Sequence, residues 1–280
     1  MRQWLAIAAA VAIGMMTSAD VSSVAAPTSK LAAGETAQPA VDVELVLAVD
    51  VSYSMDIDEL ALQREGYAEA ITSREFLQAL KQGPNGRIVV TYFEWAAAGD
   101  QKIIVPWRVV DGPEAADALS AEIHNAPLRR ASRTSISGAI NFAVPLFDDS
   151  GHRGLRRVID ISGDGPNNSG PPVTEARDAA LARGITINGL PIMLKAPTYS
   201  TMDIDHLDYY YEDCVTGGIG SFVVPIQTRE TFKEAIRTKL VQEVAGLRPE
   251  PPRVVPAAAA GEPRVLCSIG ERIWQDRWGR

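Results

Sequence analysis

Hydrophobic and polar positions divide the chain into short apolar runs that alternate with longer segments of helical periodicity. Runs such as "ELVLAV" and "RVIDIS" are almost continuously apolar, which is typical of strands that are covered on both faces. The pattern predicts strands at residues 43–49, 87–95, 102–107, 157–162, 185–190 and 221–225. It predicts helices at residues 58–72, 113–123, 135–147, 173–183 and 230–244, and a weaker one at 203–211.

The regular alternation of strands and helices indicates an α/β fold built on a doubly wound sheet. One connection differs, because "TYFEWAAAGDQKIIVPW" contains two strands joined by a short Gly-Asp turn and no helix. Such a connection favours an antiparallel hairpin. We therefore expect a mostly parallel, Rossmann-like sheet with one antiparallel edge strand.

The N-terminal segment has the pattern of a secretory signal peptide. One arginine precedes an apolar run at residues 4–16, and small residues follow up to Ala26, where we expect cleavage. The run is shorter than the roughly 20 residues that span a membrane, although an uncleaved anchor is the alternative. The expected organisation is a signal peptide at 1–26, a flexible leader at 27–40, a domain at 41–244, and a Pro/Ala-rich linker and C-terminal tail at 245–280. The mature protein is thus expected to be periplasmic or secreted, with no membrane span.

Two cysteines, Cys214 and Cys267, lie in the exported part of the chain. In an oxidising compartment an even pair favours one disulfide, and two free thiols are the alternative. The disulfide is expected to hold the C-terminal tail, which carries two tryptophans, against the domain.

The charge distribution argues against nucleic acid or an anionic membrane as a partner. Aspartate and glutamate total 35, lysine and arginine 27, and the formal net charge is −8. The basic residues do not form a run, whereas nucleic-acid-binding domains concentrate theirs on one face.

Oxygen-bearing side chains follow the predicted strands at positions that the fold brings together. Asp50 ends the first strand, Asp164 follows the strand at 157–162, and Thr134 precedes the helix that leads into that strand. Ligands bind at the carboxyl ends of strands in such sheets, where the strand order reverses. Because no His or Cys is among these residues, a hard cation such as Mg²⁺ is favoured over zinc or copper. The five candidate ligands are Asp50, Ser52, Ser54, Thr134 and Asp164.

This arrangement resembles the von Willebrand factor type A (VWA) domain and its metal-ion-dependent adhesion site (MIDAS). The family pattern is Asp-x-Ser-x-Ser, then a threonine before a helix, then an aspartate in an Asp-Gly turn, and the five candidate ligands match it in order. The resemblance covers about residues 41–244 and points to an uncharacterised group of exported bacterial proteins. It implies a divalent metal, Mg²⁺ or alternatively Mn²⁺ or Ca²⁺, whose open position is completed by an Asp or Glu of a partner protein.

The third loop departs from the commoner Thr-Asp-Gly form, because Ser162 and Gly163 precede Asp164. This leaves Asp160 as a fallback ligand. Asp160 lies within the apolar strand, however, and a buried carboxylate there needs a hydrogen-bond partner that the sequence does not identify.

A calcium loop of the EF-hand type is excluded at Asp50, because Met55 occupies its sixth position and Ala61 its twelfth. Asp56 and Asp58 are better explained as acids at a helix start, with Asp58 capping a helix that begins at Glu59.

Three functions follow from these residues. The favoured one is a non-enzymatic, metal-dependent protein-binding domain in the cell envelope. A Mg²⁺-dependent hydrolase of a small phosphorylated substrate is the second, although the sequence offers no general base for it. The third is a metal-free scaffolding domain that assembles through other surfaces.

Overall fold

The computed structural model describes residues 38–195, 202–246 and 263–279. These residues belong to one compact unit, Gln38–Arg280. The expected signal peptide, most of the expected leader and much of the Pro/Ala-rich linker lie outside the described residues.

A five-stranded sheet in the order β3-β2-β1-β4-β5 forms the centre of the fold. The strands are β1 (Ala40–Asp50), β2 (Ile88–Trp95), β3 (Gln101–Val110), β4 (Arg153–Gly163) and β5 (Ile185–Pro191). All neighbouring strands are parallel except β2 and β3, which form an antiparallel pair at one edge. The predicted fold class is therefore confirmed.

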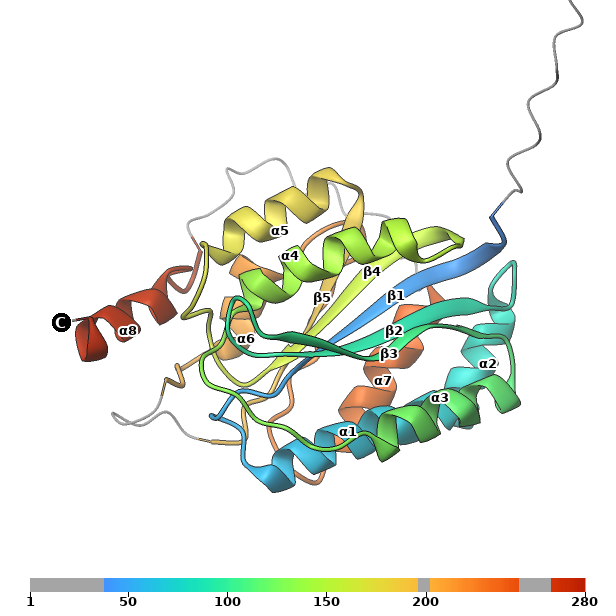
Figure 1. Cartoon of the computed structure of the whole chain (residues 1–280), viewed down its shortest axis with the longest axis horizontal. Coiled ribbons are helices and arrows are strands. Elements are labelled where there is room, and N and C mark those ends of the chain that lie inside the picture. Colours follow the sequence, from blue (N-terminus) through green and yellow to red (C-terminus); the bar gives the residue numbers. More distant parts are fainter. Residues whose placement is uncertain (1–37, 196–201, 247–262, 280) are drawn as a thin grey trace, which may run out of the picture. The chain divides into compact units, whose positions relative to one another are not determined.

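Helices cover both faces of the sheet (Figure 1). One face carries α1 (Ile57–Thr72), α2 (Arg74–Gln82), α3 (Pro113–Asn125) and α7 (Phe232–Ala245). The opposite face carries α4 (Ile136–Leu146), α5 (Val173–Ala182) and α6 (Leu207–Tyr210). Successive side chains of β1 alternate between the two cores, with Leu45 and Leu47 in the first and Val46 and Ala48 in the second. Burial on both faces explains why β1 is apolar at nearly every position.

The expected strand at 221–225 is wrong. The structure has only isolated β-bridges there, between Gly189 and Val223 and between Ile192 and Ile226. Asn188 Oδ1 accepts the N–H of Phe222, and Pro225 has no N–H, so a continuous ladder does not form.

Several helical segments differ from the sequence-based expectation. Helices α2 and α8 (Ile269–Trp278) were not predicted. The weak helix expected at 203–211 is only α6, followed by a π-helical turn at Tyr211–Val215. A single 3₁₀ turn at Phe147–Asp149 extends α4.

The start of α1 corrects the assignment of its cap. Asp56, not Asp58, is the N-cap: its carboxylate accepts the N–H of Glu59 at 2.8 Å, and the Glu59 carboxylate accepts the N–H of Asp56 at 2.8 Å. This reciprocal capping box starts the helix at Ile57, two residues before the Glu59 start that a cap at Asp58 implied. Asp58 lies in the first turn, where an acid favours the helix dipole.

Among the described residues, no helix is both long and apolar enough to cross a membrane.

Candidate metal centre

Asp50 is the last residue of β1 and is completely buried between the ends of β2 and β4. Its Oδ1 accepts the N–H of Ser52 at 2.7 Å, and Gln63 of α1 donates to its carbonyl at 3.2 Å. Its Oδ2 has no hydrogen-bond partner among the described residues. A buried, unpaired carboxylate oxygen is costly, so this atom is available to a positively charged ligand.

Two serines connect the first loop to the third. The hydroxyls of Ser52 and Ser54 are 2.8 Å apart, and Ser54 donates to Asp164 Oδ1 at 2.5 Å. The structure thus brings together four of the predicted ligands, including two that are more than a hundred positions apart in the sequence.

Thr134 is held beside this group by the loop that follows Asp164. Its N–H donates to Asn168 Oδ1 at 3.0 Å, and its carbonyl accepts the Asn168 N–H at 2.8 Å. Asn167 in turn accepts from the backbone N–H of Ser137 in α4 at 3.0 Å. Thr134, Ser52 and Ser54 line one cavity of about 330 Å³. The second and third loops are therefore fixed to one another by asparagine side chains.

An ion cluster centred on the buried Glu94 fixes the segment that leads into Thr134. Glu94, at the end of β2, binds the guanidinium of Arg129 at 3.0 Å and also pairs with Arg64 of α1. Arg129 further contacts Asp100 at 2.7 Å. These contacts anchor the 126–131 segment to the end of the sheet.

Gly163 allows Asp50 and Tyr211 to approach the end of β4. A Cβ added at this position would lie 2.9 Å from Asp50 Oδ2 and 2.9 Å from the hydroxyl of Tyr211. Tyr211 is completely buried, and its hydroxyl has no partner among the described residues. The glycine in "SGDG", which departs from the commoner motif, therefore accommodates Asp50.

The electrostatics of the two carboxyl groups favour a cation between them. Burial raises the pKa of Asp50 to about 7, against the hydrogen bonds from Ser52. Burial also raises the pKa of Asp164, and the Asp50 charge raises it further. Two buried acids that oppose one another's ionisation are stabilised together by a divalent ion, which cancels their charge.

The donor set therefore fits a hard divalent cation. It offers two carboxylates and three hydroxyls, all oxygen, from Asp50, Ser52, Ser54, Thr134 and Asp164. Among the described residues, no group of three His, Cys, Asp or Glu side chains forms a metal cluster, so a site made only of such ligands is not the alternative.

Asp160, the fallback ligand, has the partner that the sequence did not identify. Lys239 of α7 places its Nζ 2.8 Å from Asp160 Oδ1, and both side chains are buried. Lys239 also binds Glu243 at 2.7 Å. Asp160 is thus neutralised by a lysine, which leaves Asp164 as the carboxylate of the third loop.

Sequence analysis missed the residues that support the ligands. Asn167 and Asn168 lie in a polar run, "PNNSG", whose only signal was its position after Asp164. Tyr211 lies in "DYYYED", whose tyrosines indicate helix packing, but the register of a tyrosine run does not show which ring reaches Asp50.

The fold is that of a von Willebrand factor type A domain. Similar solved structures include proximal thread matrix protein 1 from the mussel byssus, with a TM-score of 0.55 and 12% identity over 74% of this chain and 49% of that chain. A von Willebrand factor type A protein from Catenulispora acidiphila has a TM-score of 0.51 and 14% identity, over 73% of this chain and 43% of that one. The pilus adhesin SpaC from Lactobacillus rhamnosus GG has a TM-score of 0.53 and 12% identity, over 74% and 32%. The chain spans about half or less of the length of these proteins.

The sequence matches the model of the family described as "Protein of unknown function (DUF1194)" over residues 40–248, and the chain belongs to that family. A comparison with curated protein sequences gives no match.

Proposed function

We propose that this protein binds a partner protein through a divalent cation held by Asp50, Ser52, Ser54, Thr134 and Asp164. The observation that carries the proposal is Asp50, a completely buried carboxylate whose Oδ2 has no partner among the described residues. A bound cation neutralises Asp50 and Asp164, and it supplies an open position for a carboxylate of the partner.

The descriptions of two similar structures mention metal binding or adhesion, and this supports the proposal. A second structure of the mussel matrix protein, at a TM-score of 0.52 and 14% identity, is described as having a zinc-occupied MIDAS motif, and SpaC is described as a pilus adhesin. For this chain, the all-oxygen donor set favours Mg²⁺, with Mn²⁺ and Ca²⁺ as alternatives.

We further propose that the domain acts in the periplasm or outside the cell. The N-terminal signal pattern and the Cys214–Cys267 disulfide, with its Cα atoms 5.4 Å apart, support an oxidising compartment.

Calorimetric titration of Mg²⁺, Mn²⁺, Ca²⁺ and Zn²⁺ into the purified protein tests the metal site. We expect uptake of one ion by the wild type and by Asp58→Ala, which changes an exposed aspartate of the same segment. Asp50→Ala should take up none. If the wild type takes up no divalent ion, the proposal is wrong.

A metal-assisted hydrolase is the second candidate, and one observation favours it. His206 and Asp164 line the same cavity of about 250 Å³, which places an imidazole near the metal ligands as a possible base. The ring of His206 stacks on Tyr209 with centroids 4.9 Å apart, however, which favours a packing role. Metal-dependent turnover of small phosphate esters that His206→Ala abolishes would establish the enzyme instead.

A further inference from the structure

Helix α8 lines the cavity above the candidate metal centre. Trp274 of α8 borders the same cavity of about 330 Å³ as Ser52, Ser54 and Thr134. The family match ends at residue 248, so α8 lies beyond the part of the chain that it covers. Helix α8 therefore contributes Trp274 to the wall of this cavity from outside the part of the chain that the family match covers.

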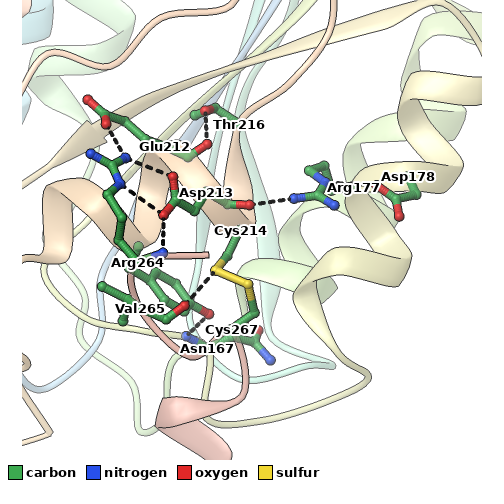
Figure 2. Close-up of a disulfide and its surroundings, with 11 residues drawn as sticks. Asn167, Arg177, Asp178, Glu212, Asp213, Cys214, Thr216, Arg264, Val265 and Cys267 are labelled. Atoms are coloured by element: carbon green, nitrogen blue, oxygen red, sulfur yellow. Dashed lines mark hydrogen bonds and ion pairs between the residues drawn. A yellow bond between two sulfur atoms is a disulfide. The ribbon is translucent and has the colours of Figure 1, made fainter. Parts of the chain in front are cut away.

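Helix α8 is held in place by covalent and polar contacts. The Cys214–Cys267 disulfide joins the segment just before it to the π-helical turn, and Arg264 binds Asp213 and Glu212 beside that disulfide (Figure 2). The carboxylate of Glu271 in α8 accepts a hydrogen bond from Nδ2 of Asn167, in the loop after Asp164, at 2.7 Å.

Gly270 brings the helix against the loop of the metal centre. A Cβ on Gly270 would lie 2.1 Å from the carbonyl oxygen of Asn167, so only glycine permits this approach. Asn167 is the residue that joins the loop after Asp164 to α4. The position of α8 is therefore defined by the same loop that carries a metal ligand.

Two arginine–aromatic pairs include the cavity-lining residues Tyr53, Arg133 and Trp274. The guanidinium of Arg133 lies 3.9 Å from the ring centroid of Trp274, and that of Arg130 lies 5.2 Å from the ring of Tyr53. Tyr53 is 60% exposed, and Arg133 is exposed as well. We call these four residues the cation–aromatic rim. Trp, Tyr and Arg are enriched at protein interfaces and among the residues that contribute most to binding.

The backbone of Arg133 supports a role at the surface. Its φ is +72°, a left-handed conformation that is unfavourable for an arginine. The residue directly precedes Thr134, and this conformation accompanies the contact between its guanidinium and Trp274.

The rim is positive although the protein is acidic. A divalent ion would cancel the charges of Asp50 and Asp164, and Lys195 pairs with Glu59 at 2.6 Å. The remaining charged side chains are Arg133 and Asp203, which line the cavity, and Arg130, which lies over the ring of Tyr53 at its border. The rim therefore has a positive excess on a chain of net charge −8.

We propose that the cation–aromatic rim selects an acidic segment of the partner protein. One carboxylate of that segment completes the metal, its neighbouring acids bind Arg133 and Arg130, and its chain packs on Trp274 and Tyr53. This inference rests on the proposed function, because the central carboxylate needs the metal.

Two capped, fluorescein-labelled peptides test the inference by anisotropy in Mg²⁺. The first is Ser-Glu-Asp-Glu-Ser and the second is Ser-Gln-Asp-Gln-Ser, so both carry the central aspartate and only the flanking charge differs. We expect the wild type to bind the Glu-flanked peptide at least about fivefold more tightly. Arg133→Ala and Trp274→Ala should lose that preference, whereas the matched control Arg272→Ala, an exposed arginine of α8, should keep it.

The outcomes separate the rim from the metal. Both the metal site and the rim are supported if EDTA and Asp50→Ala abolish binding of both peptides, while Arg133→Ala and Trp274→Ala lose only the preference for the Glu-flanked peptide. Three outcomes would overturn the proposal that the rim selects an acidic segment. The wild type could bind the two peptides equally or bind neither, or both rim variants could keep the preference for the Glu-flanked peptide. If peptide binding survives EDTA but is lost in the rim variants, the rim proposal stands and the proposed metal-dependent binding is refuted. Thermal melts and Trp274→Phe, which retains a ring and should retain most of the preference, show that losses do not reflect unfolding.

Discussion

The Nζ of Lys239 lies 2.8 Å from the carboxylate of Asp160, and neither side chain contacts solvent. This pair joins α7 to the middle of β4, and Lys239 also binds Glu243, whose second oxygen accepts from Asn188 of β5. A lysine in the core is tolerated only because both acids surround it.

Lys239→Met should therefore destabilise the protein by about 3–5 kcal/mol, because it leaves Asp160 and Glu243 as buried acids without a cation. Denaturant unfolding followed by circular dichroism measures the loss. Lys233→Met removes a lysine of the same helix that pairs with Glu65 and Glu69 near the surface, and it should change the midpoint little. If the two substitutions lower the free energy of unfolding equally, the buried Lys239–Asp160 pair contributes no more to stability than the surface pairs of Lys233.

The stability of Lys239→Met should depend on pH in a defined direction. Burial raises the pKa of Asp160 from 3.8 to about 6, although Lys239 lowers it. The folded protein thus binds this proton more tightly than the unfolded chain, so the Asp160 contribution to stability falls as pH rises from about 4 through 6. Without Lys239 the pKa is higher still. We expect the stability of Lys239→Met to fall more between pH 5 and pH 8 than that of the wild type, as measured by unfolding at both values.

Asp164→Asn should abolish metal uptake and stabilise the metal-free protein by about 1–2 kcal/mol, because it removes one of two opposing buried acids. Calorimetric titration and thermal melts in EDTA measure the two effects. Asp58→Asn, the same change at an exposed position, should alter neither. A metal-free Asp164→Asn protein that melts below the wild type would contradict this account of the site.

Two glycines of one loop provide a matched pair. Gly163→Ala should weaken metal binding at least about tenfold and destabilise the protein by about 1–3 kcal/mol, because its Cβ would displace Asp50. Gly165 has no atom within 4 Å of an added Cβ, so Gly165→Ala should bind metal as the wild type does. Both variants are compared by the same titration, and a similar loss in Gly165→Ala would mean that general loop perturbation is responsible.

Removal of the disulfide should release α8 and leave the metal centre in place. The two cysteines are 53 residues apart, and a closed loop of that size contributes about 2–4 kcal/mol. Cys214→Ser/Cys267→Ser should lose about this stability and still take up metal. In the native protein both cysteines should resist alkylation until a reductant is added; rapid labelling without reductant would rule out the bond in solution.

The sequence predicted the sheet and the ligand loops because both depend on local pattern. Continuous apolar runs indicated buried strands, and a ligand that follows each strand lies at the same edge of a parallel sheet. The strand expected at 221–225 failed for two reasons. Pro225, which is visible in the sequence, cannot donate to a ladder, and the Asn188 side chain accepts the N–H of Phe222, which only the tertiary structure reveals.

Other features escaped because long-range contacts determine them. Helix α2 has Phe76, Ala79 and Leu80 buried at helical spacing, but it was missed because Ser73, which caps its start, is also the residue that ends α1. The cation–aromatic rim depends on a disulfide that brings α8 beside Arg133. The cap of α1 was misplaced because three acids lie within four residues, and only the reciprocal bonds of Asp56 and Glu59 identify it.

The Cys214–Cys267 bond also gives α8 a connection that does not depend on the main chain. A protease that cuts the polypeptide once between α7 and Cys267 separates α8 in sequence but leaves it covalently bound. Such a nicked protein would run as one species on a non-reducing gel and as two after reduction. It would also keep Trp274 beside Ser52, Ser54 and Thr134, so a single cut in that segment would not release α8.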